Sequence, residues 1–263
     1  MRNLIEDVRK SVVFLGKRTE GKKIGRLGTG FLLELQNTFL LVTAKHVVVD
    51  EKTGDLNDDG MLVFLNEKSG RMALRCLNDY THRFGFEWVF HENDEVDIAI
   101  IPFMSDPQKD DVEPIAENLL LGADELSELY DVFFLSFEPG IVPTNRITPI
   151  IRSGTISAIN DDKTFHIDAF AFPGNSGSPV FLKLAIRFEE RGIFINPDLG
   201  GNLIGVIGEY LAYQESAKST QTGRIRVVFE ENKGLSKVWS VTFIKDIVES
   251  DAFKQQLGKL AKE

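Results

Sequence analysis

The chain has 263 residues, of which 43% are hydrophobic and 27% charged, with a formal net charge of −10. This acidic balance argues against nucleic acid as a main partner, because nucleic-acid binding needs clustered Lys and Arg. No run of about 18 apolar residues is present, so we expect neither a transmembrane helix nor a membrane partner. The single cysteine, Cys76, excludes an internal disulfide.

The first part of the chain predicts strands that lead to a histidine. Residues 3–10 predict a short amphipathic helix, and residues 11–15 predict the first strand. Two apolar runs within residues 27–42 are typical of a hairpin. We expect a single helical turn over residues 43–49, and this turn carries His46 just past the end of a strand.

An acidic residue opens the last predicted strand of this first half. Strands are expected over residues 61–65, 72–77 and 96–103, and Asp97 begins the apolar run DIAIIP within the last of them. Asp94 lies in the polar loop before it and is the rival candidate for an acid that contacts His46.

The second half predicts more strands and a terminal helix. Residues 106–128 are polar and are expected to connect the two halves. Residues 188–201 are expected to form an insertion, and the polar residues 212–223 a mobile loop. Apolar residues at helical spacing predict a helix over 244–260. The strands are expected at residues 131–137, 147–159, 164–167, 180–186, 203–211, 224–229 and 237–243.

The segment PGNSGSPV at residues 173–180 places Ser176 between two glycines. Glycines allow a sharp turn and a close approach of another backbone. A turn of this kind can present N–H groups to an oxyanion beside a nucleophilic hydroxyl. A serine is a poor nucleophile at neutral pH and needs a base that a carboxylate orients. His46 and Asp97 are the candidates for these two roles.

Three motifs, TAKH at 43–46, DIAI at 97–100 and GNSGSP at 174–179, resemble those of the trypsin-like (chymotrypsin-fold) serine endopeptidases. Their order, His then Asp then Ser, is that family's order. The segment GTGF at 28–31 is similar to the bacterial HtrA protease unit and the glutamyl-endopeptidase group. The resemblance covers roughly residues 10 to 245 and predicts a bacterial protease.

The resemblance implies an all-β fold of two six-stranded antiparallel β-barrels with a C-terminal helix. It implies one peptidase domain over residues 1–263, with the active site between the barrels. The expected parts are a first barrel at about 11–105, a connector at 106–128, a second barrel at about 129–243 and the helix at 244–260.

The resemblance also implies the roles of the site residues. Ser176 would be the nucleophile, His46 the base and Asp97 its orienting acid, with the N–H groups of Gly174 and Ser176 as the oxyanion hole. No metal or cofactor is needed. The implied substrate-binding residues are Phe170, Ala171, Phe172, Pro173, Ile207, Gly208, Glu209 and Tyr210.

These residues favour an uncharged, small or apolar substrate side chain. Phe170 stands where a preference for Lys or Arg would need an acid, and Ile207 stands where the glutamyl-endopeptidase group has a histidine. Glu209, at the rim of the implied pocket, is compatible with a preference for a basic substrate residue near the cleaved bond. Gly208 departs from the serine that supports the triad aspartate in many relatives.

Several alternatives stay open at this level. The chain could be a catalytically silent or latent module that binds a protein partner, or an esterase-like acyl hydrolase, although an α/β-hydrolase would place its histidine last. Residues 55–60 match the start of a calcium loop, but a polar turn is the simpler interpretation. Asn175 stands in place of an aspartate that pairs with a freed N-terminus in members activated by cleavage, so we expect control by loop ordering or by an activating protein partner.

The remaining expectations concern location and partners. The N-terminal residues lack the apolar core of a signal peptide, and the chain cannot form an internal disulfide. Both observations predict a cytoplasmic protein. The expected partner is a protein or peptide substrate.

Overall fold

The computed structural model describes residues 4–18, 24–57, 60–138, 145–183, 185–189, 192–196 and 201–260. The first half contains α1 (Leu4–Ser11), β1 (Val12–Arg18), β2 (Ile24–Leu35), β3 (Thr38–Thr43), α2 (Lys45–Val48), β4 (Met61–Asn66), β5 (Met72–Cys76), α3 (Leu77–Phe84), β6 (Val89–Phe90), β7 (Ala99–Pro102) and β8 (Ile115–Ala116). Two 3-10 turns follow, η2 (Glu117–Leu119) and η3 (Ala123–Glu125). The second half contains β9 (Asp131–Ser136), β10 (Ile150–Ile159), β11 (Thr164–Asp168), β12 (Pro179–Leu182), β13 (Ala185–Glu189), β14 (Gly192–Asn196), β15 (Leu203–Lys218), β16 (Ile225–Ser240), α4 (Val241–Glu249) and α5 (Asp251–Leu260).

The second half contains the closed six-stranded barrel that was expected, in the order β10-β11-β16-β15-β12-β9. The first half differs from the expected six strands. It is a sheet of eight strands in the order β5-β4-β1-β2-β3-β7-β6, with β8 paired to β2. That last pair is parallel, and it places Ile115 of the expected connector beside Leu33 of β2. The mostly β architecture with C-terminal helices confirms the expected fold class.

Alternate side chains of the same strand belong to different cores. In β2, Leu32 packs in the core inside the first half, whereas Phe31 and Leu33 pack in the core between the two halves. In β9, Phe134 faces the core of the barrel and Leu135 faces the shared core. This is the two-residue alternation of a strand buried on both faces. The shared core therefore brings the two halves together along one seam.

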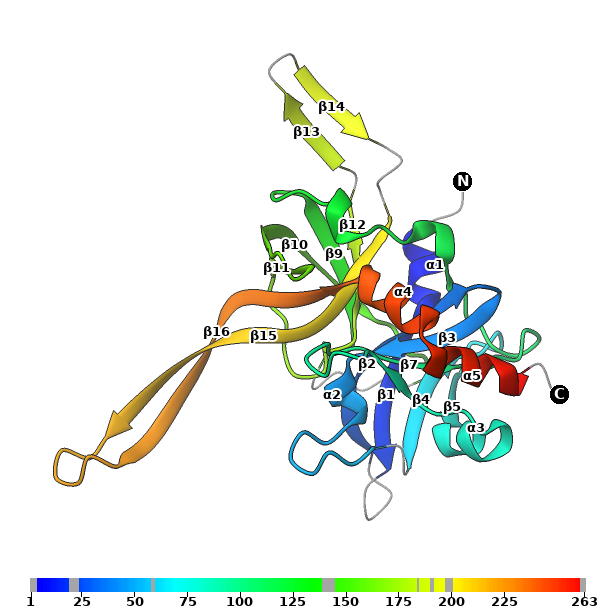
Figure 1. The fold of residues 1–263 in the computed structure, drawn as a ribbon, viewed down its shortest axis with the longest axis horizontal. Helices are drawn as coiled ribbons and strands as arrows, with labels where there is room; N and C mark the ends of the chain where they lie inside the picture. Colours follow the sequence, from blue (N-terminus) through cyan, green and yellow to red (C-terminus); the bar gives the residue numbers. More distant parts are fainter. Residues whose placement is uncertain are drawn as a thin grey trace.

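The C-terminal helices cover this seam (Figure 1). Buried residues of α4, among them Ile244 and Ile247, join the shared core. The single helix expected over 244–260 is wrong, because the chain breaks at Ser250, whose ψ of 154° is extended. The Ser250 hydroxyl donates to the Ile247 carbonyl at 2.7 Å and accepts from the Phe253 N–H at 3.2 Å. Serine at this position caps the start of α5.

A long hairpin of β15 and β16 projects away from the body of the molecule (Figure 1). Each of its strands has 16 residues. The mobile loop expected over 212–223 is therefore wrong, since cross-strand pairs continue out to Lys218 and Ile225. The segments 224–229 and 237–243 are likewise not separate strands, because β16 runs unbroken through the first and on to Ser240. The expected insertion after β12 contains a second small hairpin, β13 and β14.

None of the helices in the described ranges is long and apolar enough to cross a membrane.

The outer part of the long hairpin should contribute little to stability, because its side chains are exposed. Replacing residues 215–229 by a two-residue Asn-Gly turn would join Gln214 to Glu230, which already face each other. We expect the melting temperature to change by less than about 3 °C. Phe181→Ala is the contrasting control, since removing that fully buried ring should cost about 3–5 kcal/mol. A large loss of melting temperature in the shortened chain would contradict this assignment.

Candidate active site

His46 lies on the single turn α2, directly after β3. Val47 and Val48 are buried, and they anchor this turn against the core of the first half. The imidazole remains 29% exposed. The strand therefore delivers a fixed histidine to the surface at the seam.

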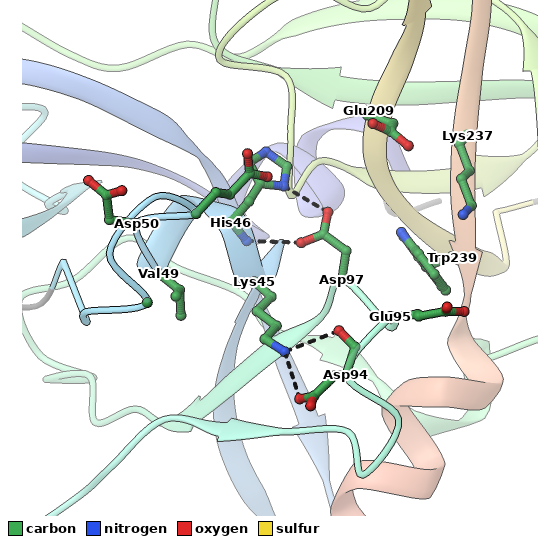
Figure 2. Close-up of a pocket in the computed structure, with 12 residues that line it drawn as sticks. Lys45, His46, Val49, Asp50, Asp94, Glu95, Asp97, Glu209, Lys237 and Trp239 are labelled. Atoms are coloured by element: carbon green, nitrogen blue, oxygen red, sulfur yellow. Dashed lines mark hydrogen bonds and ion pairs between the residues drawn. The ribbon is translucent and has the colours of Figure 1, made fainter.

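Asp97 holds His46 at two points. Its Oδ2 lies 2.7 Å from His46 Nδ1, and its Oδ1 accepts the backbone N–H of His46 at 2.9 Å (Figure 2). The pairing of β3 with β7 at Thr43 and Ala99 brings the two segments together. Asp94 contacts Lys45 instead, at 3.3 Å, and its side chain is almost fully exposed. The acid that orients the imidazole is thus Asp97, not Asp94.

The charge around His46 favours its protonated form. Burial by itself would lower the pKa of His46, but the hydrogen bond that Asp97 accepts and the negative charges of Asp97, Glu51 and Glu209 outweigh it. The pKa of His46 is therefore raised above its usual 6.5. An imidazole with a raised pKa is a stronger proton acceptor.

The loop that carries Ser176 is fastened to β2 of the other half. The Thr29 N–H donates to the Ser176 carbonyl at 2.9 Å, and the Thr29 hydroxyl donates to the Gly174 carbonyl at 2.8 Å. Gly174 and Gly177 have φ angles of +102° and +84°. A Cβ at Gly177 would lie 2.0 Å from the Thr29 carbonyl oxygen. Only glycine fits this approach between the two halves.

Ser176 and His46 line the same hollow, of about 350 Å³. In the described part of the chain, no hydrogen bond joins the two side chains. Catalytic hydrogen bonds are often long or poorly aligned until substrate is bound. The structure therefore brings the three predicted residues to one site and joins two of them directly.

A charged network that the sequence did not reveal positions Asn175, which is fully buried. Its amide Nδ2 donates to Glu138 at 3.2 Å, and its Oδ1 accepts the Phe172 N–H at 2.8 Å. Arg152 forms an ion pair with Glu138 at 2.8 Å. Burial would raise the pKa of Glu138, but the bonds from Arg152 and Ser136 hold it below its usual value. Nothing in the sequence links 138, 152 and 175, which only the barrel brings together.

Most of the predicted substrate-binding residues line the hollow beside Ser176. They are Ala171, Phe172, Pro173, Ile207, Gly208, Glu209 and Tyr210.

Phe170, which was also predicted to bind substrate, does not line the hollow. Its ring is 54% exposed, stacks on Phe172 and lies against Gly234. Alternation along the chain buries Ala171 and turns Phe170 outward. Two further residues that line the hollow were not predicted from the sequence. Ala212 lies in a segment that was expected to be a loop, and Glu230 follows a segment that was expected to be a separate strand.

Trp239 leaves no space for a side chain at position 208, where the chain has glycine. A Cβ there would lie 2.7 Å from Nε1 of Trp239 and 3.5 Å from Oδ2 of Asp97. The indole thus occupies the space that a serine would need beside the triad acid. Lys237 lies over the Trp239 ring, with its Nζ 4.2 Å from the ring centroid (Figure 2).

A second hollow of about 490 Å³ adjoins the site at His46. Carboxylates dominate its lining (Figure 2): Asp50, Glu51, Asp94, Glu95, Asp97 and Glu209, against Lys45 and Lys237. A cleft lined mainly by one sign of charge attracts ligands of the opposite sign.

The possible calcium loop is only partly described. Asn57 accepts a hydrogen bond from Lys17 at 3.3 Å. Within the described ranges, no group of three or more His, Cys, Asp or Glu residues could hold a metal ion. Asp58 and Asp59 lie outside the described residues.

Comparisons with known proteins show the family and the fold. A family model described as "Trypsin-like peptidase domain" matches residues 28–184, a range that contains His46, Asp97 and Ser176. Among the similar solved structures is the serine endoprotease from Yersinia pestis, which is 15% identical with a TM-score of 0.52. That alignment covers 95% of this chain and 66% of the other, just under two thirds of its length. At this identity the likeness shows the fold. No curated protein matches the sequence.

Thr29 should be needed to hold the Ser176 loop, because its buried hydroxyl donates to Gly174 and accepts the Phe137 N–H. Thr29→Val keeps the shape but leaves these partners unsatisfied. We expect a loss of about 1–3 kcal/mol in the free energy of unfolding, measured by urea denaturation. Thr29→Ser retains the hydroxyl and should stay close to the wild type. Equal losses in both variants would show that the methyl group, not the hydroxyl, matters.

Proposed function

The chain belongs to the family of trypsin-like peptidases, and from this premise we propose that it is a serine endopeptidase that cleaves peptide bonds in protein substrates. Ser176, His46 and Asp97 form its catalytic triad. The observation that carries the proposal is the two-point contact of Asp97 with His46 at the hollow that Ser176 lines.

The reaction would proceed in two stages. His46 Nε2 takes the proton of the Ser176 hydroxyl as its oxygen bonds to the substrate carbonyl carbon. The imidazolium then gives that proton to the leaving amine, and the peptide bond breaks to leave an acyl-enzyme. A water molecule then bonds to the acyl carbon while His46 takes its proton. The ester bond to Ser176 breaks as His46 returns that proton to the serine oxygen, which releases the acid.

The other groups stabilise charge during these steps. Asp97 accepts the Nδ1–H of His46, which directs Nε2 toward the serine and stabilises the imidazolium. The N–H groups of Gly174 and Ser176 would bind the oxyanion, where one donor is typically worth about 2.7–4 kcal/mol of barrier. The network of Asn175, Glu138 and Arg152 supports that turn.

The second candidate is a latent or catalytically silent module that binds a protein partner. It is favoured by one observation, the lack of a hydrogen bond between His46 and Ser176 in the described residues. An activating protein partner that moves the serine loop would reconcile the two candidates.

A fluorophosphonate probe separates these candidates, since it reacts only with an activated serine. We expect the purified full chain to be labelled, and Ser176→Ala and His46→Ala to lose the label while keeping the wild-type circular dichroism spectrum. Asp94→Asn is the matched control and should label normally. A well-folded wild-type chain that stays unlabelled would support the binding module instead.

The rate of labelling should depend on pH through His46. The neutral imidazole is the base, so the rate should fall as the pH drops through the raised pKa of His46. Asp97→Asn removes the carboxylate whose hydrogen bond and charge contribute most to raising this pKa, so the pKa of His46 should fall. It should also slow labelling by about 10⁴-fold, because an amide in place of the triad carboxylate leaves the imidazole in the wrong tautomer.

The pKa itself can be followed by NMR titration of the ring protons, since the chain has only four histidines. Asp94→Asn serves again as the control and should leave the titration of His46 in place. An unchanged His46 titration in Asp97→Asn would contradict the assigned contact.

A further inference from the structure

We infer that Glu230 selects substrates with a lysine or arginine immediately before the cleaved bond. This inference rests on the proposed peptidase function and names its substrate class. It departs from the uncharged preference that the sequence favoured, because Glu230 enters the site only through the long hairpin.

The position of the hollow decides which substrate side chain enters it. The carbonyl carbon that Ser176 attacks is bonded directly to the Cα of the preceding residue. The side chain on that Cα must therefore lie within a few ångströms of Ser176. The hollow that Ser176 lines has about 350 Å³ and includes Glu230, and this volume is within the range of small-ligand sites.

The Glu230 carboxylate is held in place by two neutral donors. The Tyr210 hydroxyl donates to Oε1 at 2.7 Å, and the Gln214 amide donates to Oε2 at 3.0 Å. An ionised carboxylate has about four acceptor sites, so both oxygens can accept further bonds. A side chain that is already ordered loses less entropy when it binds. The hydrogen bond from Tyr210 has the largest effect on the pKa of Glu230, followed by the bond from Gln214. Both bonds lower this pKa, which keeps the carboxylate ionised.

The walls of the hollow suit the stem of a basic side chain. Ala171, Phe172, Pro173 and Ala212 are apolar, and no Lys or Arg lines the hollow in the described ranges. Lysine and arginine combine an apolar stem with a charged end. The nearby Arg152 lies over the Phe172 ring, but its charge is paired with Glu138.

The register of the hairpin explains why Glu230 is available. Gln214 of β15 faces Glu230 of β16 directly, beyond the last residues that pair with the barrel strands β11 and β12. Tyr210 and Gln214 lie four residues apart on β15, and both donate to the same carboxylate. Glu209 and the acidic hollow beside His46 add negative potential around the site.

The test uses two diphenyl aminophosphonates that react with an activated serine, one with a lysine side chain and one with norleucine. They differ only in the amine. We expect the wild-type chain to react roughly 10- to 100-fold faster with the lysine probe, the range for a hydrogen bond to a charged group. Glu230→Gln keeps the size and the bonds from Tyr210, and it should bring the ratio close to one. Glu231→Gln is the matched control on the neighbouring exposed residue and should keep the wild-type ratio.

Two further variants separate charge from structure. Glu230→Asp should keep the preference for lysine, and Glu230→Lys should reverse it toward a glutamate probe. Equal rates for both probes in the wild type, or an unchanged ratio in Glu230→Gln, would overturn this inference and leave the peptidase proposal intact. A wild-type chain that the uncharged fluorophosphonate also fails to label would overturn the proposed function and this inference together.

Discussion

The burial of alternate strand side chains in separate cores determines where the two halves of this molecule meet. Side chains such as those of Phe31 and Leu135 pack between the two halves in a shared core, to which α4 also contributes. The seam that results is crossed by the hydrogen bonds from Thr29 to the Ser176 loop and by the tight approach of Gly177. The site exists only because this packing holds a histidine of one half beside a serine of the other.

The electrostatics of the seam are unusually one-sided. Carboxylates orient His46, brace the turn at Asn175 and line both hollows beside the site. The hydrogen bond that Asp97 accepts and the negative charges of Asp97, Glu51 and Glu209 together raise the pKa of His46. The carboxylates around the site attract cations, in line with the inferred preference for basic side chains.

The hairpin of β15 and β16 shows how an extension of a barrel can alter its active site. Its outer part contributes exposed side chains and little burial. Its inner part carries Tyr210, Gln214 and Glu230 into one hydrogen-bonded group at the wall of the hollow. Two strands that extend beyond the barrel thus place a charge that the barrel itself does not supply.

The sequence alone indicated the family, most of the strand positions and the three candidate catalytic residues, because these depend on short motifs and on local periodicity. The predictions of one helix over 244–260 and of a loop over 212–223 are wrong. Ser250 caps a new helix within an apolar helical pattern that continues across it, and the outer strands of the hairpin have exposed side chains with no buried face to mark them in the sequence. Only the tertiary structure decided that Asp97 and not Asp94 contacts His46, that Trp239 excludes a side chain at Gly208, and that Glu230 lies at the site. Each of these facts depends on strand register across the sheets, and a shift of one residue in register would turn every such side chain to the opposite face.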